Sequence, residues 1–367
     1  MILSRQPELL KQTQLLFQRL YRAAVCMKTA ALTAFQIGKE FAMSSGNQLG
    51  KNSGVLKPIL KNREFTIFII LLFMMVVSAI VSPTFRSAGN IANIFNQNAM
   101  YGLMAIGMSF VLIGGGMDLS IGSTSALAGM VAALMMRDFG SVGLGILAAL
   151  LVGLVIGLVN GLIIIYLKLP PFIVTLGTMY IARSVCLAMT KAHPVSGFPS
   201  WVVTVGIGKW HGIPIAAAIW IVLAVAMNWV LKRTKFGQYV YALGGNEKAA
   251  WLSGIKTKTI RIFTYILNGL FASVAGLIVV YRLMIATGDA NDGYEMIAIA
   301  ACVIGGVSMN GGRGSVIGSV FGALIYGLIV NMLQLIGVSG FWQKAVIGAI
   351  IIIVSCIDSL SSSKKRQ

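Results

Sequence analysis

The chain has 367 residues, of which 57% are hydrophobic and only 11% carry a charge, and its formal net charge is +19. Soluble domains carry about 25% charged residues, so the composition excludes an ordinary soluble protein and indicates a membrane protein. The cations gather beside apolar segments rather than on one basic face. This pattern excludes nucleic acid as a partner and indicates contact with membrane lipids.

Residues 1–60 form a basic extension ahead of the first apolar segment, and we expect it on the cytoplasmic side. Apolar and basic residues alternate at helical spacing from Leu9 to Lys28, which is typical of a helix lying on a membrane surface. The alternative is that Met43, which opens a polar leader of ordinary length, is the true start. No function is assigned to this extension.

Residues 61–360 contain ten apolar segments, which we predict to form one transmembrane domain. The segments are 65–82, 99–114, 119–136, 143–167, 172–190, 214–231, 262–282, 295–308, 315–335 and 342–357. A membrane-spanning helix needs about 20 residues, so we expect the second, third and eighth segments to be tilted, broken or re-entrant. The predicted fold is an all-α polytopic membrane protein with about ten transmembrane or re-entrant helices.

The distribution of basic residues predicts the orientation, because Lys and Arg beside apolar spans remain on the cytoplasmic side. Ten crossings that begin inside place the 232–261 loop, with its seven cations, in the cytoplasm. The basic tail 361–367 lies there too, so both termini are expected to be cytoplasmic. Eight full spans with two re-entrant hairpins would give the same sidedness.

The sequence lacks the usual signatures of catalysis. It has no GxxxxGK[ST] phosphate loop, no HExxH zinc helix and no GxSxG elbow, and its four cysteines lack metal-ligand spacing. His193 and His211 are expected to be polar surface. Asp118, Glu295 and Arg183, the last predicted to be the deepest charge, form no acid pair or proton relay, which argues against ion coupling. We expect no catalytic residues, no metal and no cofactor.

Two glycine-rich breaks, at residues 114–123 and 305–315, occupy equivalent places in the two halves of the chain. Paired interruptions of this kind often mark a transport path, and the alternative is two tight turns. The predicted path residues, in these breaks and after the prolyl pair at 170–171, are Asp118, Ser120, Thr175, Thr178 and Asn310. The two threonines would otherwise bond back to their own helix.

Glycines also recur every four residues in two places, a spacing that puts them on one helix face where two backbones can approach closely. The two sets are Gly153, Gly157 and Gly161, and Gly314, Gly318 and Gly322. We expect both sets to pack helices rather than to touch a substrate.

The 232–261 loop is the one long polar stretch between apolar segments. Residues 246–254 are predicted to form a short helix, with Gly244-Gly245 breaking the chain before it and Gly254 capping it. Ala249, Ala250 and Leu252 would give this helix a small apolar face that fits a groove on a soluble partner. The alternative is an ordinary solvated basic loop.

Four motifs, taken in order, resemble the permease subunits of bacterial ABC-type sugar importers, the group of ribose, xylose, arabinose, galactose and autoinducer-2 permeases. They are GGMDLSIGS at 115–123, PFIVTLGT at 171–178, YALGGNEKAAWLSGI at 241–255 and GYEMIAIAACVIGGVSMNGGRG at 293–314. The resemblance covers about residues 60–360. It implies a type II-like importer fold in the bacterial inner membrane and a transport subunit that is not itself an enzyme.

The resemblance also implies partners and a substrate class. Cytoplasmic ABC ATPase subunits would hydrolyse ATP, a periplasmic or lipid-anchored solute-binding protein would deliver a monosaccharide such as ribose, and a second permease copy or paralogue would complete the path. The residues that match the family's ATPase-coupling helix are Gly245, Asn246, Glu247, Ala249, Ala250 and Gly254.

Departures from the family pattern affect the substrate prediction. Met296-Ile297 follows the Gly-Tyr-Glu run, where relatives commonly carry an acidic residue, and Leu-Met-Ile-Ala-Thr-Gly follows Arg282 in place of a Ser-Ala-Gln-Pro stretch. An autoinducer-2 or nucleoside permease is therefore an alternative within the family. An ion-coupled secondary transporter is an alternative outside it.

Overall fold

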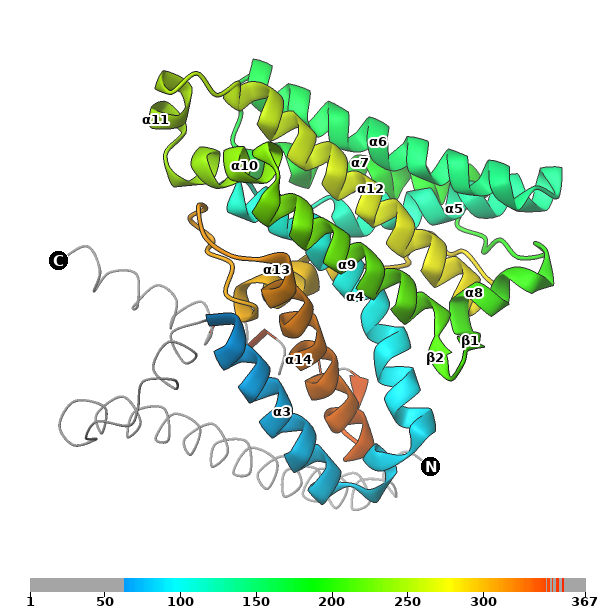
Figure 1. The fold of residues 1–367 in the computed structure, drawn as a ribbon. Helices are drawn as coiled ribbons and strands as arrows, with labels where there is room; N and C mark the ends of the chain where they lie inside the picture. Colours follow the sequence, from blue (N-terminus) through cyan, green and yellow to red (C-terminus); the bar gives the residue numbers. More distant parts are fainter. Residues whose placement is uncertain (1–62, 341, 344, 346–347, 350–351, 353–367) are drawn as a thin grey trace, which may run out of the picture. The chain divides into compact units, whose positions relative to one another are not determined.

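The computed structural model describes residues 63–340, 342–343, 345, 348–349 and 352, and these are mostly helical (Figure 1). The predicted extension 1–60, the tail 361–367 and most of the segment 342–357 lie outside the described residues. Among the described residues, six helices have the length and apolar composition to cross a membrane. They are α3 (Arg63–Val81), α6 (Val142–Tyr166), α7 (Pro171–Thr190), α9 (Ile215–Arg233), α12 (Thr257–Leu283) and α14 (Val316–Leu335).

The helix α4 (Ala88–Ile113) shows that the prediction of a short segment at 99–114 was wrong, since it has 26 residues. Its first half carries asparagines, which obscured the apolar signal. These side chains find partners inside the protein: Asn90 and Asn331 exchange hydrogen bonds of 3.2 and 2.9 Å. Every residue from Asn98 to Ile113 is buried, so α4 is a central helix.

The helix α13 (Tyr294–Ile304) is shortened, as the sequence predicted for this segment. Its 11 residues extend about 16 Å, half the thickness of a bilayer core. The chain then turns through residues 305–315 into α14. The helix α5 (Ile121–Phe139) follows the first break, just as α14 follows the second, and it has 19 residues.

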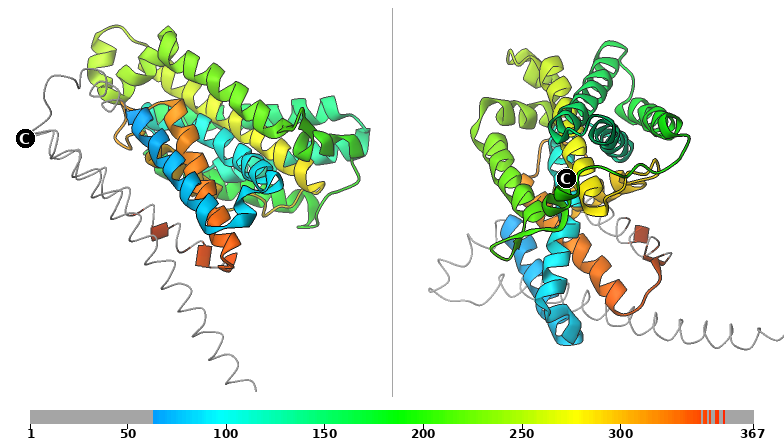
Figure 2. Two further views of the ribbon diagram at one scale, coloured as in Figure 1. Left: turned by 60° about the horizontal axis from the view of Figure 1, so that its bottom comes forward. Right: turned by 90° about the vertical axis from the view of Figure 1, so that its right-hand side faces the viewer.

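The helices differ in how much of their surface faces the protein. In α3 only 17% of the apolar window is buried, compared with 67% in α12 and in α14. Exposed large apolar side chains cover α3, α6, α7 and α9, as expected of helices that face lipid. Both views of Figure 2 show α3, the first half of α4 and α14 together as one group, whose shared apolar core includes Ile67, Leu71, Ile94, Ile325 and Leu328.

Short elements lie at the two ends of these helices. At one end are η2 (Pro83–Arg86), η3 (Ser200–Val202), α8 (Val203–Ile207) and the antiparallel strands β1 (Lys209–Trp210) and β2 (Ile213–Pro214); at the other are α10 (Lys235–Gly245) and α11 (Glu247–Leu252) (Figure 1). The small hairpin departs from the all-α prediction. Its turn residues, His211 and Gly212, have φ values of 48° and 84°, which suit a two-residue hairpin turn.

Glycine packing holds α6 against α12. The α-carbons of Gly153 and Gly157 face the backbone of α12, and an added Cβ on Gly153 would collide with the Gly269 carbonyl, just as a Cβ on Gly269 would collide with Gly153. This confirms the predicted packing role of the first glycine set. The second set was predicted wrongly in part: Gly318 and Gly322 pack on α13, but Gly314 lies in the preceding loop with a φ of 140°.

We expect Gly269→Ala to lower the free energy of unfolding by about 1–3 kcal/mol, because the new methyl group must push α6 and α12 apart. Thermal unfolding of the purified protein in detergent measures the effect. The matched control is Gly177→Ala on α7, where an added Cβ meets no atom within 4 Å. Equal unfolding temperatures for the two variants would contradict the packing role.

Candidate functional site

The first break between α4 and α5 is built around Asp118, whose side chain is only 2% exposed. Its Oδ1 accepts hydrogen bonds from the backbone N–H and the hydroxyl of Ser120, at 2.8 and 2.6 Å. Its Oδ2 accepts from the Asn268 amide on α12, at 2.8 Å. Neutral donors therefore hold both oxygens, and these bonds supply the hydrogen-bond partners that a buried carboxylate needs.

Hydrogen bonds extend this network to α6 and α7. The Asn160 amide donates to the Ser120 hydroxyl at 3.0 Å, and the Thr178 hydroxyl donates to the Asn160 carbonyl oxygen at 2.6 Å. The Leu119 N–H donates to the Thr175 hydroxyl at 3.1 Å. Four of the five predicted path residues thus belong to one polar cluster, which we call the Asp118 network.

The Asp118 network contains two residues that the sequence analysis missed, Asn160 and Asn268. Both are fully buried and each is a lone amide within a long apolar segment, which was the available signal. The sequence left open whether Thr175 and Thr178 face a polar path or bond back to their own helix. Thr175 and Thr178 bond back to Pro171 and Val174 at 2.9 and 3.0 Å, and each also joins the network.

That Arg183 is the deepest charge in the membrane stays a prediction, but it is not the most buried charge within the described part of the protein. Its side chain is partly buried, and the guanidinium donates to the carbonyls of Gly288 and Ala290, at 2.8 and 2.7 Å, in the connection between α12 and α13. Asp118 is more deeply buried. Arg183 therefore orders the connection between α12 and α13, while the carboxylate of Asp118 organises the interior of the protein.

Asn310, the fifth predicted path residue, lies apart from the Asp118 network and is exposed in the second break. This break contacts α10 and the end of α4 through glycines. The Gly312 N–H donates to the Ile113 carbonyl at 2.8 Å. A Cβ on Gly244 would collide with that same carbonyl and with Gly312. We call the meeting point of Gly115, Gly244, Gly311 and Gly312 the glycine junction.

The sequence predicted residues 232–261 to be a loop with one short helix. The structure instead places two helices there, α10 and α11. Gly244 and Gly245 are the last residues of α10, so the chain breaks one residue later than expected, at Asn246. The Asn246 side chain caps α11 by accepting from the Ala249 N–H at 3.0 Å. Thr234 caps α10 in the same manner, at 3.3 Å from the Gly237 N–H.

The predicted short helix with a Gly254 cap is confirmed. Gly254 has a φ of 82°, and its N–H donates to the Trp251 carbonyl at 2.9 Å, while the Ile255 N–H donates to the Ala250 carbonyl at 3.1 Å. These two bonds form a Schellman motif, the usual end of a helix that stops at glycine. The end of α11 is therefore sharply defined.

The surface of α11 differs from the predicted small apolar face. Ala250 is buried, Ala249 is exposed, and the large side chains of Trp251 and Leu252 are 64% and 70% exposed. Glu247 ties this helix to α12 through an ion pair of 2.9 Å with Arg261. An apolar pair of this size, projecting from a charged end of the helices, suits contact with a partner.

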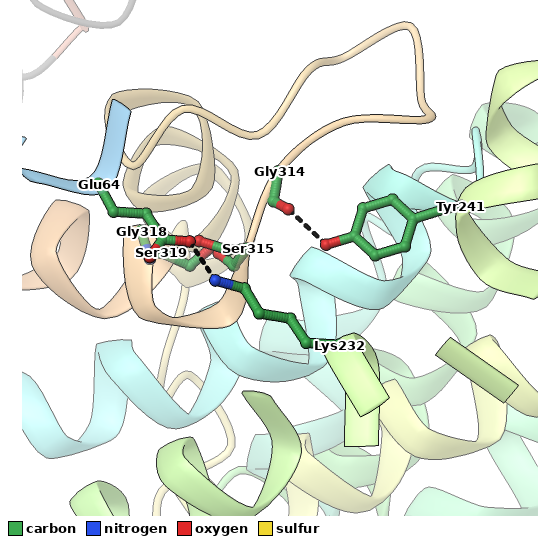
Figure 3. Close-up of polar contacts among 7 residues, drawn as sticks. All are labelled: Glu64, Lys232, Tyr241, Gly314, Ser315, Gly318 and Ser319. Atoms are coloured by element: carbon green, nitrogen blue, oxygen red, sulfur yellow. Dashed lines mark hydrogen bonds and ion pairs between the residues drawn. The ribbon is translucent and has the colours of Figure 1, made fainter. Parts of the chain in front are cut away.

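Two further contacts join this region to the start of α14 and to α3 (Figure 3). The Tyr241 hydroxyl donates to the Gly314 carbonyl at 2.6 Å. Burial raises the pKa of Tyr241 and the nearby Glu64 carboxylate raises it further, so the phenol remains a neutral donor. Lys232, at the end of α9, forms an ion pair of 2.6 Å with Glu64 on α3.

We expect Asp118→Ala to lower the free energy of unfolding by on the order of 3 kcal/mol, because three buried hydrogen bonds lose their acceptor. Denaturant unfolding in detergent measures it. Asp138→Ala is the matched control, because that carboxylate is exposed and pairs with Arg137 at the surface. If both variants retained the stability of the original protein, the Asp118 network would not be what holds the first break.

Comparison with known proteins places the chain among transport proteins. Residues 90–355 match the family described as the branched-chain amino acid transport system / permease component. The ribose import permease protein RbsC of Bacillus subtilis is 42% identical over 81% of this chain and 92% of its own length. RbsC of Escherichia coli K12 is 40% identical, over 79% and 92%.

The galactose/methyl galactoside import permease protein MglC of Escherichia coli K12 is 37% identical, over 83% of this chain and 96% of its own length. No solved structure matches the chain. The family match spans both glycine-rich breaks, α10 and α11. The chain therefore belongs to this family of transport-system permease components, a multi-pass membrane family whose members include the ribose and galactose import permeases.

Proposed function

We propose that this protein is the membrane-spanning subunit of an ATP-driven ABC importer that moves a monosaccharide, with a ribose-like sugar as the best candidate. The relatives named as ribose and galactose import permeases support the substrate class. Separate cytoplasmic ATPase subunits supply the energy. A solute-binding protein and a second permease copy or paralogue complete the bacterial inner-membrane assembly.

The observation that carries this proposal is the structure of α11. A short helix, capped at both ends and exposing Trp251 and Leu252, projects beyond the apolar helices where a soluble ATPase would reach it. The same end carries many of the cations, including Lys232, Arg233 and Lys235, so the positive-inside rule supports a cytoplasmic location.

The predicted coupling residues take distinct roles in this proposal. Asn246 and Gly254 define the two ends of α11, Glu247 binds α12 through Arg261, and Ala250 packs inward. Gly245 and Ala249 are exposed and small, so they allow a partner surface to approach closely. ATP-driven closure of the partner subunits would displace α11 and, with it, α12.

The Asp118 network acts in this proposal as the support of the transport path. Asp118, Ser120 and Thr175 are too well satisfied and too buried to bind sugar in the described conformation. Because Asn268 lies on α12, movement of α12 would reach the first break directly. Asn310, exposed beside the glycine junction, remains a candidate for the cytoplasmic end of the path.

Reconstitution in liposomes tests the function. With the solute-binding protein outside and the ATPase subunits inside, we expect D-ribose uptake that requires ATP. Uptake of autoinducer-2, a nucleoside or D-galactose in place of D-ribose would reassign the substrate within the family. Uphill uptake by the purified permease alone, driven by an ion gradient, would overturn the proposed ATP-driven mechanism.

We expect Glu247→Arg to lower D-ribose uptake about tenfold, within the range typical of coupling free energies, because it replaces an ion pair with two facing cations. Gly254→Pro should act similarly, since proline cannot adopt a φ of 82° or donate the capping hydrogen bond. Membrane insertion should be retained.

Transport assays with immunoblots of membrane fractions measure both effects. Lys248→Ala, at an exposed neighbour on α11, is the control and should transport normally. Normal uptake and normal ATPase stimulation in Glu247→Arg would show that α11 is not the coupling helix.

A further inference from the structure

Glu64 joins three helices that are distant in the sequence (Figure 3). It lies on the first turn of α3, and its Oε1 is 2.6 Å from the Nζ of Lys232 on the last turn of α9. The side chain of Ser315, the N-cap of α14, interacts with the same carboxylate. The two charged side chains are only 26% and 40% exposed.

Tyr241 reaches the same place from α10. Its hydroxyl binds the carbonyl of Gly314, the residue directly before Ser315, at 2.6 Å. Ser315 in turn accepts from the Gly318 N–H at 3.0 Å and so sets the first turn of α14. Glu64 contacts Ser315 and Tyr241 contacts Gly314, so both side chains bind the two consecutive residues that position α14.

These contacts connect the segment that carries α11 to α3 and to the start of α14. Thr234 alone separates α9 from α10, and it caps α10. Lys232 on α9 and Tyr241 on α10 therefore belong to one continuous structure. The helix α3 packs in an apolar cluster that contains no residue of α12, whereas α14 contributes to this cluster and, through Val316 and Ala323, to the one that includes Phe271 of α12. Displacement of α12 through Arg261 would therefore not act directly on α3, and α14 lies between the two clusters.

We propose that Glu64, Lys232 and Tyr241 are positioning residues of a second transmission route, which carries the movement of α10 and α11 to α3 and α14. The inference rests on the proposed function. It divides the work of α11 between two routes: the Glu247–Arg261 pair acts on α12 and the Asp118 network, and the Lys232–Glu64 pair with the Tyr241–Gly314 bond acts on α14 and α3.

Charge exchange tests the second route in the complete reconstituted importer. The quantity measured is D-ribose taken up per ATP hydrolysed, which a purely structural defect would not change in correctly inserted protein. We expect Lys232→Glu and Glu64→Lys each to lower this ratio about fivefold, the scale of a partly exposed ion pair turned repulsive. The double exchange should restore most of it, and Tyr241→Phe should lower it further in combination with either single variant.

Lys235→Glu is the matched control, because it changes the same charge at an exposed position near the start of α10. A Lys232→Glu ratio equal to that of Lys235→Glu, or a double exchange no better than the single variants, would overturn the proposal. Should Lys232→Glu fail to insert, Lys232→Met removes the ion pair without placing two carboxylates side by side and makes the same test. Absence of ATP-dependent uptake by the unmodified importer would instead refute the proposed function, and this inference with it.

Discussion

A helix interrupted inside a bilayer must satisfy its freed backbone groups within the protein, because no water is present to do so. This constraint determines how the two breaks are built. Side chains hold the first break, where Asp118 accepts three hydrogen bonds and Thr175 accepts one from the backbone of Leu119. In the second, the backbone N–H of Gly312 donates to the carbonyl that ends α4, and the Tyr241 hydroxyl donates to the Gly314 carbonyl. The two breaks therefore differ in the groups that hold them: a buried carboxylate organises the first, and backbone contacts together with the Tyr241 hydroxyl and the side chains of Ser308 and Ser315 hold the second.

The glycine junction gives the breaks a common neighbour. Because Gly244 ends α10 while packing on Gly312 and on the carbonyl of Ile113, the element that carries α11 touches both interruptions at once. Contact between bare backbones leaves no flexible side chain to absorb a displacement. The position of α10 therefore depends on the positions of the two breaks through direct backbone contact, and not through a long chain of side chains.

The sequence was sufficient for helices whose apolar runs approach membrane length, and α6 and α12 were located within a few residues. It was insufficient for α4, where asparagines that pair inside the protein resemble a polar connection, and for α10, whose mixed composition resembles a loop. In the site, Asp118 and Thr175 stood out because they flank breaks or prolines. Asn160 and Asn268 did not, because their importance depends on which residue faces them across the packed helices.

The exposure of Trp251 and Leu252 has a consequence for the cell that makes this protein. If α11 binds a cytoplasmic ATPase subunit as proposed, a copy inserted without that subunit would present an indole and an isobutyl group to the cytosol, the kind of surface that promotes aggregation and recognition by proteases and chaperones. Synthesis of the chain in step with whatever covers α11 would keep that surface hidden, so the ratio of the two products matters as much as their amounts.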